Sequence, residues 1–280
     1  MRPTRLAALS LSLLLVSACG GGESGPAGPS AAVAASNSSD SGDGGAGPQA
    51  PSTPTAAPRP WDPTAGIAKV SGQVSFAGDT PRRRKVDMGS DAECSGLHAE
   101  KPLDESAVVG AGGGLANVFV WVRKGLDAWV FTPPTEAVVI NQQGCVYIPH
   151  VLGAQVGQPV EVRNADPITH NVHGYSKKNT GFNQTQAPGS NAITREFKRS
   201  EVFVTLKCDI HGWMNTYLGV VEHPFFTVTD EDGSFDLGTL PPGDYQIAAR
   251  HEVFGLQKQD ITIGADGAAQ TLEFGFTEED

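Results

Sequence analysis

Apolar and polar residues alternate along short stretches of the chain beyond residue 60. The stretches are residues 70–76, 160–163, 202–206 and 245–249, and residues 118–122 are a short, wholly apolar run. A repeat of two residues is typical of a β-strand that buries one face. Clusters of glycine, proline, asparagine and aspartate separate the stretches, and the spacing of an amphipathic helix is nearly absent. The pattern predicts an all-β protein of the sandwich type.

The N-terminus has a different pattern. Arg2 and Arg5 precede an apolar run over residues 6–16, which ends in small residues and Cys19. This pattern predicts a secretory signal peptide over residues 1–19, because a membrane span needs about 20 apolar residues. The ending at residues 16–19 resembles a bacterial lipobox, which implies cleavage before Cys19 and lipid attachment to it. An ordinary signal peptide cleaved nearby is the alternative.

Residues 20–60 contain mainly small and polar residues and almost no large apolar side chain. Such a segment buries too little surface to offset the entropy lost on ordering. We predict a flexible, disordered linker that tethers the folded part to a membrane, with a glycosylated stalk as the alternative. The protein would then lie in the bacterial cell envelope, lipid-anchored, facing the periplasm or the outer surface.

The net charge limits the possible partners. Cleavage removes Arg2 and Arg5 and no acidic residue, so that 18 basic residues oppose 31 acidic ones and the net charge is −13. Such acidity argues against nucleic acid and against docking on anionic lipid, which leaves the lipid anchor as the membrane contact. It favours partners with a basic docking surface, attracted over long range.

The C-terminal part contains a strand, an acidic turn and a strand over residues 226–237. Asp232-Gly233 predicts a hairpin there, because glycine supplies the positive φ that hairpin turns need. With the turn at residues 240–245, the pattern resembles carboxypeptidase regulatory-like domains, which are small transthyretin-like sandwiches. Residues 70–74 and 115–120 resemble the first strands of the same domain. The resemblance implies a sandwich made of residues 61–134 and 223–280, with residues 135–222 inserted; two consecutive domains are the alternative.

Residues 135–222 contain the candidate chemistry. Cys208, His211 and Met214 are spaced by three residues in a loop that follows a strand. A thiolate, an imidazole and a thioether around one centre favour copper, and the blue-copper arrangement adds a second imidazole. His170 lies 38 residues upstream, where another strand begins. His173 is the rival for that role, since the two histidines point to opposite faces of a strand.

The order of a His-Asn-Val-His run and then Cys-x-x-His-x-x-Met resembles the cupredoxins over about 90 residues. The resemblance implies a Greek-key β-sandwich holding one copper ion that cycles between Cu(I) and Cu(II). The ligands carried over are His170, Cys208, His211 and Met214, and Asn171 matches a residue that ties the two ligand loops together. Trp213 is either a buried anchor or part of an apolar docking patch around an exposed edge of His211.

Three cysteines remain if Cys19 is lipidated. Cys94, Cys145 and Cys208 are an odd number in an oxidising compartment, which indicates one disulfide and one thiolate with another role. We favour a Cys94–Cys145 disulfide and Cys208 as the metal ligand, although three cysteines allow three pairings.

These features favour an electron carrier between a redox donor and a redox acceptor. We expect no enzyme activity, because a copper reductase or oxidase needs a second copper site with about three further imidazoles. The histidines outside the ligand set are scattered along the sequence. The alternative is a non-catalytic binding or scaffold lipoprotein with a carbohydrate or protein ligand and a structural or vestigial copper site.

Overall fold

The computed structural model describes residues 57–278, which lie in one compact unit of the chain. The predicted signal peptide, the lipidation site at Cys19 and all but the last residues of the predicted linker lie outside the described residues. The described chain is almost entirely β, so the predicted all-β class is confirmed. None of its helices is long and apolar enough to cross a membrane.

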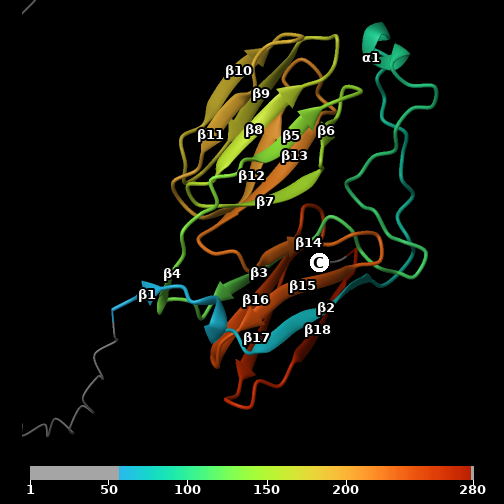
Figure 1. Cartoon of the computed structure of the whole chain (residues 1–280). Coiled ribbons are helices and arrows are strands. Elements are labelled where there is room, and N and C mark those ends of the chain that lie inside the picture. The colour runs from blue at the N-terminus through green and yellow to red at the C-terminus, as the bar shows by residue number, and fades with distance from the viewer. Residues whose placement is uncertain (1–56, 279–280) are drawn as a thin grey trace, which may run out of the picture. The chain divides into compact units, whose positions relative to one another are not determined.

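One β-sandwich is formed by residues 138–221, which we call the inserted sandwich (Figure 1). Its five-stranded sheet has the order β10-β9-β12-β13-β7, and its four-stranded sheet has the order β11-β8-β5-β6. The strands are β5 (Val138–Gln142), β6 (Tyr147–Ile148), β7 (Val151–Gln155), β8 (Pro159–Asn164), β9 (His170–Tyr175), β10 (Phe182–Gln186), β11 (Ile193–Glu196), β12 (Glu201–Lys207) and β13 (Asn215–Val221).

A second sandwich, the flanking sandwich, combines strands from both sides of the inserted one. Its sheets have the orders β14-β3-β16-β17 and β15-β2-β18. The strands are β2 (Ala68–Phe76), β3 (Phe119–Lys124), β14 (Phe226–Val228), β15 (Ser234–Leu240), β16 (Gly243–His251), β17 (Gly255–Ile263) and β18 (Gln270–Phe276). In Figure 1 the blue-green β2 lies between the red strands β15 and β18. The inserted sandwich therefore interrupts the flanking one in sequence.

Each sandwich has its own apolar core, which follows from the alternation in the sequence. In β18, for example, Leu272, Phe274 and Phe276 are buried, while the residues between them are exposed. Full burial of each such side chain contributes about 1.5–3 kcal/mol before the entropy of ordering is subtracted. The two separate cores are the reason that each sandwich can hold its shape.

A third, smaller apolar cluster joins the two sandwiches. Phe119 of β3 and Phe226 of β14 pack with Val151 and Val221 of the inserted sandwich. Gly219 permits this contact, because a Cβ there would come within 2.5 Å of the Phe119 ring. The join is apolar and close-packed at this point.

The predicted hairpin at Asp232-Gly233 is wrong. β14 pairs with β3 in one sheet, whereas β15 pairs with β2 in the other. The turn is real, since the Gly233 N–H donates to the Asp230 carbonyl and Gly233 has a φ of 75°. It carries the chain from one sheet to the other, because the apolar faces of β14 and β15 are buried in different layers.

The predicted linker ends earlier than residue 60. Arg59–Pro60 form β1, which pairs in parallel with β4 (Trp129–Val130). The Arg59 N–H donates to the Ala128 carbonyl at 3.0 Å, and the Arg59 guanidinium lies 4.2 Å from the centre of the Trp129 ring. These contacts place the end of the linker before Arg59.

Residues 85–103 form an excursion between β2 and β3 that we call the cap. Its ends are joined by an antiparallel bridge between Lys85 and Leu103. It contains the only α-helix of the described chain, α1 (Ala92–Gly96), and Asp91 accepts the Cys94 N–H at the start of that helix. The sequence analysis assigned the cap to the flanking sandwich, but Met88 and Cys94 are buried in the core of the inserted one.

His223 gives the fold a predicted sensitivity to acid. Its Nε2 lies 2.7 Å from the Val122 carbonyl, and its Nδ1 accepts the Phe225 N–H. Burial lowers the pKa of His223 to about 4, below the ordinary 6.5. The stability that depends on neutral His223 is therefore present above pH 6.5 and is lost as the pH falls towards 4, by up to about 3 kcal/mol.

We expect His223→Gln, which keeps a donor and an acceptor, to reduce this loss in urea unfolding measured at pH 7.5 and pH 5. Part of the loss of stability at acid pH should persist in the variant, since burial also lowers the pKa of His251 to about 4. If the wild-type protein and the variant lost the same stability between pH 7.5 and pH 5, with equal m-values, the role assigned to His223 would be contradicted.

Candidate metal centre

Strand pairing brings the predicted ligands together at one end of the inserted sandwich. His170 is the first residue of β9, and Cys208 follows the last residue of β12. The two strands are antiparallel neighbours, with Lys207 opposite His173. The start of β9 therefore lies beside the end of β12, and the loop after β12 reaches His170.

The loop over residues 208–214 is a closed turn. The Cys208 N–H donates to the Met214 carbonyl at 3.2 Å, and the Met214 N–H donates to the His211 carbonyl at 2.9 Å. The His211 N–H in turn donates to Cys208 Sγ at 3.4 Å. These bonds hold three side chains of the turn in the core, where Cys208, His211 and Met214 are all buried.

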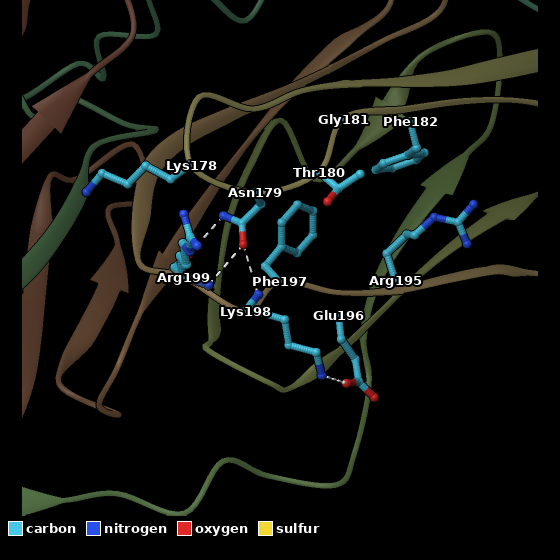
Figure 2. A pocket seen from close by; sticks show the side chains of 10 residues that line it. All are labelled: Lys178, Asn179, Thr180, Gly181, Phe182, Arg195, Glu196, Phe197, Lys198 and Arg199. Carbon is cyan, nitrogen blue, oxygen red and sulfur yellow. Dashed lines mark hydrogen bonds and ion pairs between the residues drawn. The ribbon is translucent and has the colours of Figure 1, made fainter.

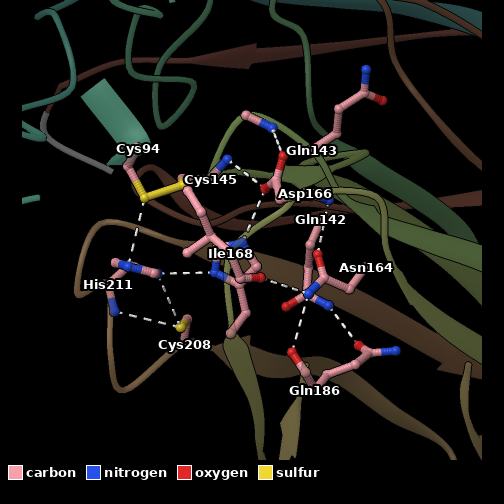
Figure 3. Close-up of polar contacts among 12 residues, drawn as sticks. Cys94, Gln142, Gln143, Cys145, Asn164, Asp166, Ile168, Gln186, Cys208 and His211 are labelled. Carbon is pink, nitrogen blue, oxygen red and sulfur yellow. Dashed lines mark hydrogen bonds and ion pairs between the residues drawn. A yellow bond between two sulfur atoms is a disulfide. The ribbon is translucent and has the colours of Figure 1, made fainter. Parts of the chain in front are cut away.

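Three of the four predicted ligands form a tight cluster (Figure 3). Ligand atoms of His170, Cys208 and His211 lie within 4.8 Å of one another. His170 Nδ1 is 2.9 Å from His211 Nδ1, which is 3.7 Å from Cys208 Sγ. Met214 is 1% exposed in the same apolar core. The structure thus brings three of the four predicted ligands to one buried place, and Met214 ends the same loop.

Asp166 fixes the tautomer of His170. Its Oδ2 lies 3.0 Å from His170 Nε2. The same carboxylate accepts the backbone N–H groups of Gly144 and Cys145 at 2.6 and 2.8 Å. Because Asp166 accepts all these bonds, we assign the His170 proton to Nε2 and a lone pair to Nδ1. Burial lowers the pKa of His170, which favours the neutral imidazole that binds metals.

Asp91 of the cap does the same for His211. Asp91 Oδ2 lies 3.2 Å from His211 Nε2, and Asp91 Oδ1 accepts the Cys94 N–H at 2.8 Å. The hydrogen bond from the Cys94 N–H, with a smaller contribution from His211, holds the pKa of Asp91 below its ordinary value. We therefore assign the His211 proton to Nε2 as well, which leaves a lone pair on its Nδ1.

The two assignments have a chemical consequence. Two unprotonated Nδ1 atoms face each other at 2.9 Å in a buried site, with a thiol beside them. Such facing lone pairs repel each other unless a cation lies between them. Two imidazoles and one thiol, with a thioether in the same loop, are a donor set that suits copper. The residues present therefore fit a copper ion.

Asn171 connects the two ligand-bearing segments, as the resemblance implied. Its Oδ1 accepts the Asp209 N–H at 2.6 Å and the Ile210 N–H at 3.3 Å, and it lies 3.3 Å from Cys208 Sγ. Its Nδ2 donates to the Asp209 carboxylate at 3.1 Å. One side chain on β9 thus orders the first half of the ligand loop.

His173 lies outside the ligand cluster. It is partly exposed, and its Nδ1 is 2.9 Å from Asp209 Oδ2. Its ring stacks on Tyr175 at 4.0 Å. The alternation along β9 turns His173 away from the core that His170 enters.

The exposed edge of His211 that the docking-patch prediction required is absent. His211 is 2% exposed, because Asp91 and Cys94 cover its Nε2 side. Trp213 is partly buried, and its Nε1–H donates to the Cys145 carbonyl at 2.9 Å. These contacts fit the anchoring role of Trp213 and not a docking patch around an open His211.

The structure contains a disulfide between Cys94 and Cys145, the pairing that the sequence analysis favoured, and leaves Cys208 as a free buried thiol. Figure 3 shows the disulfide against one side of His211, with Cys208 on the other. Cys94 Sγ lies 3.6 Å from His211 Nε2. The disulfide therefore belongs to the surroundings of the candidate centre.

Neither carboxylate was among the residues predicted from the sequence. Asp166 had a local signal, since it lies four residues before His170 and next to a proline. Asp91 had none, because it is 120 residues from His211 in sequence and reaches it only through the fold of the cap.

A basic pocket lies at the other end of the inserted sandwich (Figure 2). It has a volume of about 470 Å³ and is lined by residues 178–182 and 195–199, which include Lys178, Arg195, Lys198 and Arg199. These segments follow the end of β9 and precede the start of β12, whereas the ligands lie at the opposite ends of these strands. The pocket is therefore separate from the candidate centre.

No family model matches the chain, and no curated protein matches it. Among solved structures, the chain is similar to a mutant of amicyanin in its Cu(I) form, with 20% identity, a TM-score of 0.28, and coverage of 30% of this chain and 81% of that one. A purple cupredoxin from Nitrosopumilus maritimus has 20% identity, a TM-score of 0.26, and coverage of 29% and 97%.

A copper-containing nitrite reductase from Thermus scotoductus is also similar, with 20% identity and a TM-score of 0.29. The match covers 31% of this chain and 23% of that one. These structural neighbours are cupredoxins, and the likeness is limited to about a third of the chain. We therefore base the functional proposal on the ligand cluster and not on these likenesses.

We predict that Asn171→Ala lowers the free energy of unfolding by about 1–3 kcal/mol, because it leaves the backbone N–H of Asp209 without its acceptor. The measurement is urea unfolding of the metal-free protein. Asn183→Ala is the matched control, since Asn183 contacts only the side chains of this network. A loss for Asn171→Ala no larger than that of the control would show that the bridge does not order the loop.

Proposed function

We propose that this protein is a mononuclear copper protein that carries single electrons between redox partners. The observation that supports it most directly is the pair of Nδ1 atoms of His170 and His211, 2.9 Å apart and beside a buried thiol. When bound, copper supplies a one-electron change between Cu(II) and Cu(I). The proposed ligands are His170, Cys208, His211 and Met214.

The surroundings of the ligands suit electron transfer. Hydrogen bonds to the side-chain oxygens of Asp166, Asp91 and Asn171 fix both imidazoles and the ligand loop without a metal. The strands β9 and β12 and the closed turn over residues 208–214 hold the backbone of the same groups. A site that is rigid in this way changes little in geometry when the oxidation state changes, which keeps the reorganisation small.

The clusters of potential ligands found in the described residues support one ion. Each includes His170 or His211, so they describe one centre and its carboxylate and disulfide neighbours. An electron carrier needs only one such centre, and we infer a carrier and not an enzyme. A copper reductase would need a further group of imidazoles.

We further propose that the protein acts in the bacterial cell envelope. The supporting observations are the N-terminal pattern, which resembles a lipoprotein signal with Cys19 as the lipidated residue, and the disulfide, which suits an oxidising compartment. The partners would be a redox donor and a redox acceptor. The acidic chain favours partners with basic docking surfaces.

The first test is a visible spectrum of the soluble part, residues 57–280, loaded with one equivalent of Cu(II). We expect an intense band near roughly 600 nm that bleaches on reduction, since a Cys thiolate bound to Cu(II) in a His₂Cys site gives that charge transfer. Cys208→Ser should abolish the band. His173→Ala, which changes a histidine of the same strand outside the cluster, should leave it in place.

A protein that takes up no stoichiometric copper would contradict the proposal. In that case the binding or scaffold alternative would gain support. Loss of the band in His173→Ala with its retention in His170→Ala would instead reassign the second imidazole.

A further inference from the structure

The cap covers the side of His211 that faces away from the other ligands. His211 Nδ1 points at His170, so its Nε2 edge is the natural route to solvent. That edge meets Asp91 Oδ2 at 3.2 Å and Cys94 Sγ at 3.6 Å. The side chain of His211 is 2% exposed as a result. Both covering residues belong to a segment outside the inserted sandwich.

The cap is anchored at several points. The Cys94–Cys145 disulfide links it to the inserted sandwich, and Met88 is fully buried in the same core. His98 Nε2 lies 2.7 Å from the Gly144 carbonyl. Val86 and Leu103 face Trp213 and Met214 across a narrow cleft of about 60 Å³. These contacts hold the cap against the inserted sandwich, and the Cys94 and Ser95 N–H groups donate to Asp91 at the start of the helix.

The carboxylate of Asp91 suits its position beside the Nε2 atom of His211. A carboxylate that accepts the Nε2–H of a ligating histidine fixes the ring and raises the basicity of the other nitrogen. Asp166 makes the same contact with His170, at 3.0 Å. Both candidate imidazole ligands therefore carry a carboxylate on their far side, and two negative charges close to a copper ion favour Cu(II) over Cu(I).

On the basis of the function proposed above, we propose that Asp91 is a positioning residue for His211 and that the disulfide-anchored cap closes the solvent side of the copper centre. A redox partner then meets the cap and not the edge of His211. Asp91 acts through His211 and makes no contact with the metal itself.

The first experiment compares Asp91→Asn with Asp87→Asn, using the reduction potential and the copper affinities as readouts. Asparagine at position 91 still accepts the Cys94 N–H as a helix cap, so the fold of the cap is kept and the charge is lost. Asp87 is an exposed cap residue that pairs with Lys101 and does not contact His211. It controls for the loss of one charge from the cap.

We expect Asp91→Asn to retain the visible band and to lose about tenfold in affinity for Cu(II) relative to Cu(I). For a one-electron couple this raises the potential by about 59 mV. Asp87→Asn should shift it much less. Equal shifts in the two variants would overturn the positioning role. Absence of the band in the wild-type protein would instead overturn the proposed function, so the two failures are distinguishable.

The second experiment uses the metal-free protein and hydrogen exchange read by mass spectrometry. In the double variant Cys94→Ser, Cys145→Ser, we expect peptides from residues 85–103 to lose protection, while peptides from β12 and β13 keep theirs. Peptides of the cap that stay as protected as in the wild-type protein would show that the disulfide does not hold the cap closed. Asp91→Asn, with the disulfide intact, is the matched control and should keep the cap protected.

Discussion

Two imidazole nitrogens face each other at 2.9 Å inside an apolar core, and much of the inserted sandwich acts to keep them there. The far nitrogen of each ring meets a carboxylate, and we assign the ring proton to that nitrogen as the donor. With this assignment the arrangement is costly without a cation, because lone pairs repel in a medium that offers no water to separate them. A cation relieves the repulsion, which is why the geometry argues for a metal centre more strongly than the residue types alone.

The strands supply this geometry through their ends. β9 and β12 run in opposite directions as neighbours, with Lys207 opposite His173, so that the start of β9 lies beside the loop that follows β12. A turn of seven residues then brings a thiol and an imidazole together beside His170 and ends at the buried Met214. Asn171 ties that turn to β9 from the side. The ligand loop is thus ordered by backbone and side-chain hydrogen bonds that exist without the metal.

The flanking sandwich contributes to the centre from a distance. The cap leaves from β2 and returns to β3, two strands that pair with partners close to the C-terminus. Its two ends are therefore fixed to the flanking sandwich, and its middle is fixed to the inserted one by the disulfide. This double attachment places Asp91 against His211. It also separates the centre from solvent, whereas the basic pocket at the opposite end of the inserted sandwich remains open.

The sequence by itself determined the strand class, and it predicted the candidate ligands and, through the family resemblance, the bridging position of Asn171. Those features depend on alternation over a few residues or on spacing within one loop, which a linear pattern records. Only the tertiary structure decided that residues 230–233 turn between two sheets, that Trp213 anchors on the Cys145 carbonyl, and that Asp91 covers His211. Each depends on which layer buries an apolar face or on a contact between residues far apart in sequence. Such contacts arise from the packing of the whole chain, and no local pattern encodes them.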